Sequence, residues 1–240
     1  MIPGAVFEVR LRNTSKTAQQ GSFALSFPGP SAHESLTDTY VRGKLGGLLQ
    51  GVSVVTTKAS YALGVIGNEK ARFGGELGAD SSAWANLGTR LPRAESSKAG
   101  SAGVVDFSLA PGESKAVRFV LAWSAPVWNS AGANSGSNGS SFTHMYATEY
   151  SNAVVAANTL ARNHEPLLRR VIAWQQVVYS ENKLPVWLRD SLVNIMHLIT
   201  ETGMWAQKAD PLPEWVRKED GLFGMNESPR DCPQIECIPC

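Results

Sequence analysis

The sequence of 240 residues has few cysteines, almost no net charge and no long apolar segment. A net charge of +1 gives no electrostatic reason to expect a nucleic acid or an anionic membrane surface as a partner. No run of about 18 apolar residues is present, so no membrane-spanning helix is predicted. The first residues, MIPGAVFEVRLRN, lack the basic start and long apolar stretch of a signal peptide. This favours a cytoplasmic protein and leaves the compartment open.

Several catalytic motifs are missing as well. No pair of histidines at i and i+4 accompanies a glutamate, which excludes a helical zinc motif. The Gly-x-Ser-x-Gly string of a nucleophile elbow is absent, and so are the glycine-rich strings of P-loop and dinucleotide-binding proteins. No cofactor is therefore implied. What is present is a globular composition, 43% hydrophobic and 18% charged, that can bury a core.

The 3 cysteines lie close together in the sequence, at Cys232, Cys237 and Cys240. A secreted disulfide scaffold would distribute its cysteines along the chain. The C-x4-C-x2-C spacing leaves a metal or iron–sulfur site open. Free thiols are the favoured alternative, because no fourth ligand is nearby and Pro233 and Pro239 stiffen the segment.

The first half of the sequence has the apolar alternation of β-strands. Val6–Arg12 and Gly21–Phe27 alternate in this way around a cluster of turn-forming residues, which predicts an antiparallel hairpin. Pro111-Gly112 marks a second turn. Short strands separated by glycine, serine, asparagine and proline predict an antiparallel β-sandwich. Further strands are expected at Gly51–Thr57, Ser60–Ile66, Gly103–Leu109 and Lys115–Trp123.

In the second half, apolar residues recur every three or four positions, as on one face of a helix. A long helix is predicted from Ala153 to Val178, with Pro166 either kinking it or starting a new one. Pro185 suits the first turn of another helix, which we expect to run to about Lys208. The predicted parts are a β-sandwich, a linker helix and the start of an incomplete α domain, over residues 1–140, 141–183 and 184–240.

Three strings carry a resemblance to a known family. Phe119–Pro126, FVLAWSAP, is similar to a tryptophan-containing strand near the end of that family's N-terminal domain. His164–Trp205, with its Trp174-Gln175 pair and Leu184-Pro185 step, is similar to the linker and first helices of the catalytic domain. Gly221–Cys240 resembles the loop that follows. The family is that of the non-lysosomal glucosylceramidases, or bile-acid β-glucosidases, among the glycoside hydrolases.

The resemblance implies an antiparallel β-sandwich followed by the first helices of an (α/α)6 toroid. It also implies retaining hydrolysis of small or lipid-linked β-glycosides. That chemistry needs two carboxyl groups, one a nucleophile and the other a general acid/base. In the family the nucleophile follows a Phe-Gly pair, so Phe223-Gly224 points to Glu227. A later acid of the same loop helps to bind the sugar, and Glu236 is its best match.

The loop also departs from the better-known members. It carries Pro-Gln-Ile-Glu-Cys-Ile-Pro-Cys where they have an aromatic-rich segment, which indicates a divergent, bacterial-type branch. Arg230 and Asp231 are further candidates for binding substrate or orienting Glu227, with an ion pair inside the loop as the structural alternative. The family's acid/base residue lies downstream of this loop, so the resemblance assigns it to no residue here. We therefore expect an inactive fragment of an enzyme.

A non-catalytic function is the alternative hypothesis. The chain could be a carbohydrate-binding or structural β-sandwich with a helical extension, and Glu227 and Glu236 would then be solvated surface acids. Three tryptophans, Trp84, Trp123 and Trp128, bear on this choice, since aromatic faces suit pyranose rings whereas such residues otherwise serve packing. Packing, in the sandwich core or at a domain interface, is favoured for Trp123, and Trp84 fits either role.

Overall fold

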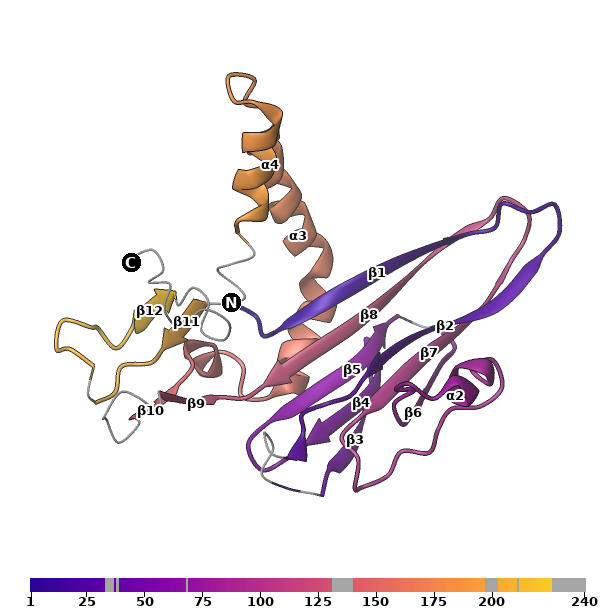
Figure 1. Ribbon diagram of the computed structural model, residues 1–240, viewed down its shortest axis with the longest axis horizontal. Helices are drawn as coiled ribbons and strands as arrows, with labels where there is room; N and C mark the ends of the chain where they lie inside the picture. The colour runs from indigo at the N-terminus through magenta and orange to yellow at the C-terminus, as the bar shows by residue number, and fades with distance from the viewer. Residues whose placement is uncertain are drawn as a thin grey trace. The chain divides into compact units, whose positions relative to one another are not determined.

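The structure, a computed structural model, describes residues 1–32, 37, 39–67, 69–130, 140–196, 203–210 and 212–225. The chain divides into two compact units. Figure 1 labels their helices and strands. Unit 1 comprises Met1–Pro126 with Ala147–Arg162, and unit 2 comprises Val127–Tyr146 with Asn163–Cys240. The predicted class, antiparallel β-structure followed by helices, is confirmed.

Unit 1 contains two antiparallel sheets. The larger has the strand order β1-β8-β5-β4-β3, and the smaller has the order β2-β7-β6. A short helix, α2 (Ser81–Ala85), follows β6. The strands are β1 (Gly4–Arg12), β2 (Gln19–Phe27), β3 (Val41–Leu45), β4 (Leu49–Val55), β5 (Ser60–Ile66), β6 (Ala71–Gly74), β7 (Ser101–Leu109) and β8 (Ser114–Ser124).

The expected hairpin between the first two strands is wrong. Strand β1 pairs with β8 and β2 pairs with β7, so the chain passes from one sheet to the other between β1 and β2. The connection between β7 and β8 also passes from one sheet to the other, at the same end of the sandwich. Backbone hydrogen bonds join the two connections, from Asn13 N to Glu113 O and from Gly112 N to Asn13 O, each 2.9 Å long. The turn residues therefore hold two crossovers together instead of closing hairpins.

The core of unit 1 lies between the sheets. Alternate residues of each strand face it, and Val117 and Phe119 of β8 have no solvent exposure. The Phe119 ring lies 5.8 Å from that of Phe23 on the opposite sheet. Towards the other end, Phe27 meets Tyr61 edge-on at 4.9 Å. These aromatic contacts fix how the two sheets pack.

The first part of α3 (Ala153–Tyr179) packs against the outer face of the larger sheet. Its buried side chains are mostly alanines, and the sheet beneath carries Gly4 and Ala122 at facing positions of β1 and β8. A Cβ on Gly4 would come within 2.6 Å of Leu160. Small residues on both surfaces let helix and sheet approach closely.

Unit 2 holds the rest of α3, a second helix and two small sheets. The long helix runs uninterrupted through Pro166, so this proline does not start a new helix. The second helix, predicted to reach about Lys208, ends at Asn194, and Gly203–Ala206 forms a strand instead. The other elements of this part of the chain are β9 (Val127–Ser130), β10 (Ser140–Thr143), the short 3-10 helix Met145–Thr148, α4 (Val186–Asn194), β11 (Gly203–Ala206) and β12 (Leu222–Met225).

Candidate active-site loop

The four predicted site residues, Glu227, Arg230, Asp231 and Glu236, lie outside the described residues, and so does the cysteine cluster. The structure does describe the strand that leads into this loop. Strand β12 ends at Met225, two positions before Glu227 in the sequence. The geometry that bears on the predicted site is therefore that of the hairpin to which β12 belongs.

Strands β11 and β12 form an antiparallel pair that contains the Phe-Gly motif. Phe223 lies opposite Trp205, and Gly224 lies opposite Met204. Because residues directly opposite each other project from the same face of a sheet, Phe223 and Trp205 share one face. Phe223 is 45% exposed, so this face presents aromatic surface. The family-like motif thus sits in a paired strand and not in a free loop.

The start of β12 is fixed by Gly221, which has a positive φ of 63°. A Cβ at this position would lie 2.3 Å from Ala206 O and 2.9 Å from Met145 Cγ, so only glycine fits. Just before it, Asp220 O accepts a 2.6 Å hydrogen bond from Trp205 Nε1. The Asp220 carboxylate also pairs with the Arg217 guanidinium. These contacts set the direction in which the chain enters β12.

A third segment, around His144, ties the hairpin to β10. His144 forms a bridge with Ala206, and Gln207 N donates to Thr143 O at 2.8 Å. The Gln207 side chain donates to His144 O at 3.2 Å. The His144 ring stacks on Tyr146 with centroids 5.3 Å apart, and burial lowers the pKa of the imidazole. This half-buried ring helps to position the hairpin, and nothing in its contacts requires a catalytic role.

Unit 1 contains a polar cluster that is structural. Both carboxylate oxygens of Asp106 accept bonds from Arg72, at 2.7 and 2.8 Å, and Ser22 Oγ donates to Oδ1 at 2.6 Å. The bonds from Arg72 hold the pKa of Asp106 below its ordinary value. Arg72 also donates to Leu87 O at 2.7 Å. The cluster joins the smaller sheet to the loop after α2, and the Asp106 carboxylate and the Arg72 guanidinium are hydrogen-bonded within it.

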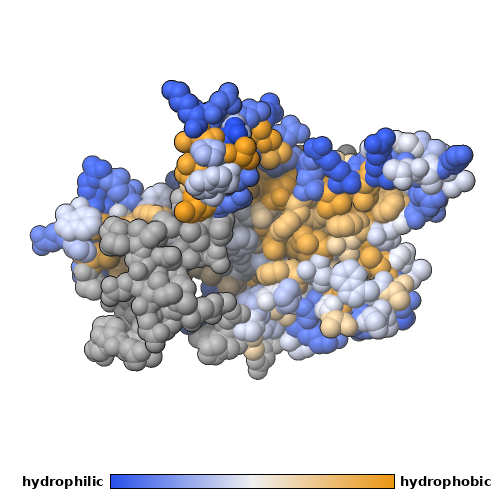
Figure 2. Space-filling model, turned by 45° about the horizontal axis from the view of Figure 1, so that its top comes forward, coloured by the Kyte–Doolittle hydropathy of each residue, from blue (hydrophilic) through white to orange (hydrophobic). Residues whose placement is uncertain are grey.

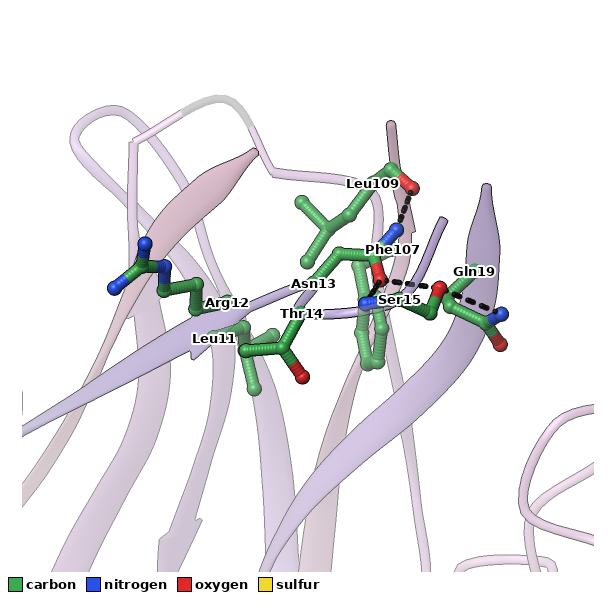
Figure 3. A pocket seen from close by; sticks show the side chains of 8 residues that line it. All are labelled: Leu11, Arg12, Asn13, Thr14, Ser15, Gln19, Phe107 and Leu109. Carbon is green, nitrogen blue, oxygen red and sulfur yellow. Dashed lines mark hydrogen bonds between the residues drawn. The ribbon is translucent and has the colours of Figure 1, made fainter. Parts of the chain in front are cut away.

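A cavity of about 270 Å³ lies at the crossover between β1 and β2 (Figure 3). Asn13 is one of the residues that line it, and its Nδ2 donates to Leu109 O at 2.9 Å and to Thr17 O at 2.8 Å. Its Oδ1 accepts from both N and Oγ of Ser15. Since these bonds use the polar groups of the side chain, Asn13 serves to hold the crossover.

Among the described residues, no group of three or more His, Cys, Asp or Glu side chains could hold a metal ion. Within the same ranges, no helix has the length and apolar character needed to cross a bilayer. Trp123 is 43% exposed, so it is not buried in the sandwich core, and packing at a domain interface stays a prediction.

The β11–β12 hairpin was not predicted from the sequence. Apolar residues after Asn194 continued the helical period and concealed the end of α4. The signal that could have located the hairpin is the pair of glycines, Gly203 and Gly221, each opening a short apolar run, with Pro211 and Pro213 between them.

A family of known proteins resembles this chain. The model of a family described as "beta-glucosidase 2, glycosyl-hydrolase family 116 N-term" matches residues 1–167. The matched range includes both sheets of unit 1 and the part of α3 that packs on the larger one. It confirms the resemblance found in the sequence. None of the curated proteins matches the chain.

Proposed function

The chain belongs to glycosyl-hydrolase family 116, and on this premise we propose that it is part of a retaining β-glycosidase of the β-glucosidase or glucosylceramidase type. The family match over residues 1–167 is the observation that carries this proposal. Substrates of this class are β-linked glycosides with a small or a lipid aglycone. The chemistry is hydrolysis through a covalent glycosyl-enzyme intermediate.

In this proposal Glu227 is the nucleophile. Retaining enzymes hold two carboxyl groups about 5–5.5 Å apart, one attacking the sugar and the other protonating the leaving group. The Phe223-Gly224 motif supports the assignment, because it precedes Glu227 in the sequence as the resemblance requires. The paired strand that holds the motif gives the following segment a fixed starting point. Rigid supporting elements are what a catalytic group needs for precise placement.

The remaining predicted residues have binding roles in the proposal. Glu236 accepts hydrogen bonds from sugar hydroxyls, and Arg230 and Asp231 contact the substrate or orient the Glu227 carboxylate. Carboxylates and guanidinium groups suit this task, because each makes two hydrogen bonds in a fixed geometry.

In this proposal α3 is the linker helix, and residues 184–240, which include α4, form the first helix and active-site loop of an (α/α)6 catalytic domain. Apolar side chains on these helices support it. A lone surface helix exposes few large apolar residues, whereas helices of a larger α domain bury them against neighbours. Figure 2 shows apolar side chains gathered on the α3–α4 helices. The large exposed ones are Leu168, Val171, Ile172, Trp174, Val177, Val186, Trp187 and Leu192.

The 240-residue chain is expected to be inactive by itself. The resemblance assigns the acid/base function to no residue in it, and protonation of the leaving group contributes about 10²–10⁴-fold to such a rate. Incubation of the purified chain with an aryl β-glucoside tests this part of the proposal. Robust turnover that Glu227→Gln abolishes would show that a proton donor lies within the 240 residues.

The catalytic part is tested on the product of the complete reading frame that contains this sequence. Hydrolysis of an aryl β-glucoside, followed by proton NMR, should first release the β-anomer of the sugar. Glu227→Gln should lower kcat by at least about 10³-fold, since the nucleophile is lost. The control Glu219→Gln changes an exposed acid ahead of β12 and should leave kcat unchanged. Initial release of the α-anomer, or full activity of Glu227→Gln, would refute the assignment.

A further inference from the structure

Residues 75–92 form a layer over the outer face of the smaller sheet of unit 1. Leu77 and Ala83 are buried against Ala102 of β7, with Leu87 and Leu91 packed around them. Backbone hydrogen bonds also hold the layer, among them Gly75 N to Pro92 O at 2.8 Å. Together with the bond from Arg72 to Leu87 O, these contacts make the layer rigid, so the surface it presents is preformed.

Two adjoining clefts open in this layer, each of about 290 Å³, and they share Asp80, Pro92 and Arg93 in their walls. Their walls carry as many acidic as basic side chains. The acidic ones are Glu76, Asp80 and Glu95, and the basic ones are Arg90, Arg93 and Lys98. Such a balance offers no net attraction to a phosphate or another strongly charged ligand. It does offer closely spaced hydrogen-bond donors and acceptors.

An exposed aromatic side chain adjoins these clefts. Trp84 of α2 is 46% exposed, although its Nε1 donates a 3.0 Å hydrogen bond to Gly78 O. Gly78 lines the first cleft, so this bond anchors the indole at the rim of that cleft. A tryptophan that serves only packing would bury its ring. Here the polar end is fixed and the apolar ring faces solvent.

Polar groups of α2 and the segment after it complete the surface. Asp80 Oδ1 accepts a 2.8 Å bond from Ser82 N, and the bonds from Ser82 hold the pKa of this exposed carboxyl below its ordinary value. The carboxylate is therefore ionised and can accept further bonds from a ligand. Asn86 and Arg90 line the second cleft and supply donors beside it.

We propose that Trp84 and the two clefts beside it bind neutral β-linked gluco-oligosaccharides. The ring hydroxyls of a β-glucopyranose unit are all equatorial, so both faces of the ring present only C–H groups and can stack on an indole. The same hydroxyls project around the ring edge, where Asp80, Asn86 and Arg90 can bond them. All of these residues belong to unit 1, so the inference does not rest on the proposed catalytic role of Glu227.

Titration of the 240-residue chain with cellotetraose, followed by calorimetry and NMR, tests the proposal. Binding is expected with a Kd of about 1 mM or tighter, as a preformed shallow site allows. Trp84→Ala should weaken it by at least about tenfold, which corresponds to about 1.4 kcal/mol. Trp84→Phe keeps an aromatic face and should retain most of the affinity. Arg90→Ala should weaken binding several-fold without touching the stacking surface.

Trp215→Ala is the matched control, because Trp215 is also exposed and lies in unit 2. It should change the affinity less than twofold. Tetragalacturonate, an anionic oligosaccharide with α-linkages and an axial O4, should bind no more tightly than cellotetraose. The proposal is overturned if cellotetraose shows no binding up to about 10 mM. It is also overturned if a folded Trp84→Ala variant binds as the parent does, or if tetragalacturonate binds tenfold more tightly.

Discussion

At the scale of single residues, Gly221 shows how one position determines the approach to the predicted catalytic loop. Its backbone has φ +63°, and an added Cβ would meet Ala206 O at 2.3 Å. We expect Gly221→Ala to destabilise the β11–β12 hairpin by more than the ~1 kcal/mol that the left-handed backbone alone would cost. The measurement is amide hydrogen exchange of the two strands.

Gly224→Ala is the control for this prediction. Gly224 lies in the same hairpin, no heavy atom lies within 4 Å of its ideal Cβ, and its φ is not positive. Exchange in this variant should stay close to that of the parent. Equal protection in both variants would show that Gly221 does not fix the hairpin.

A second prediction at this scale concerns the pH dependence of Asp106. Its pKa is lowered in the folded state by Arg72, so the folded chain holds the carboxylate in its ionised form. The resulting stability is complete above the unfolded pKa, near 3.9, and is lost as the pH falls through the lower folded pKa. Because the Asp106 side chain is 41% exposed, solvent screening limits the contribution to less than about 1 kcal/mol.

Urea unfolding at pH 7 and pH 3 checks this expectation. The parent should lose more stability between these values than Asp106→Asn does. Glu95→Gln removes an exposed acid that lies 3.6 Å from Lys98, and it should behave as the parent. An Asp106→Asn variant with the parent's full acid sensitivity would contradict the argument.

At the scale of elements, paired strands of one sheet differ in how deeply they are covered. Phe7 of β1 and Phe119 of β8 are directly opposite each other, yet Phe7 is 42% exposed and Phe119 is fully buried. Phe119→Ala should reduce the free energy of unfolding by about 3–5 kcal/mol, because it leaves a cavity between the sheets. Phe7→Ala should reduce the free energy of unfolding by well under half of that amount. Urea midpoints measure both, and similar losses would mean that β1 and β8 are equally part of the core.

The strands themselves could be predicted from sequence, whereas their pairing could not. Alternation located β5 at Ser60–Ile66 and placed β1, β2, β4, β7 and β8 to within a few residues. The pairing depends on Asn13, whose backbone and side chain bind the β7–β8 connection, about a hundred positions away in the sequence. Local patterns contain no trace of such a contact. Two strands were not predicted, because their sequences show no alternation of apolar and polar residues. They are the short, half-polar β3 and the four-residue β6.

At the scale of the whole molecule, the family could be inferred from sequence and the match over residues 1–167 confirms it. The sequence also indicated the candidate site, through the Phe223-Gly224 motif that the structure finds in β12. The hairpin around that motif could not be predicted, because it depends on the close approach of Gly221 to Ala206 and Met145, which leaves no room for a Cβ. Glu227 stays a prediction, since it lies outside the described residues.

The most direct test of the proposed nucleophile is covalent labelling of the product of the complete reading frame. A mechanism-based cyclitol inactivator of β-glucosidases forms a stable ester with the nucleophile of a retaining enzyme. Peptide mapping by mass spectrometry should find a single adduct, on Glu227, and no adduct after Glu227→Gln. A stable adduct on a different carboxylate, with Glu227 unmodified, would contradict the account.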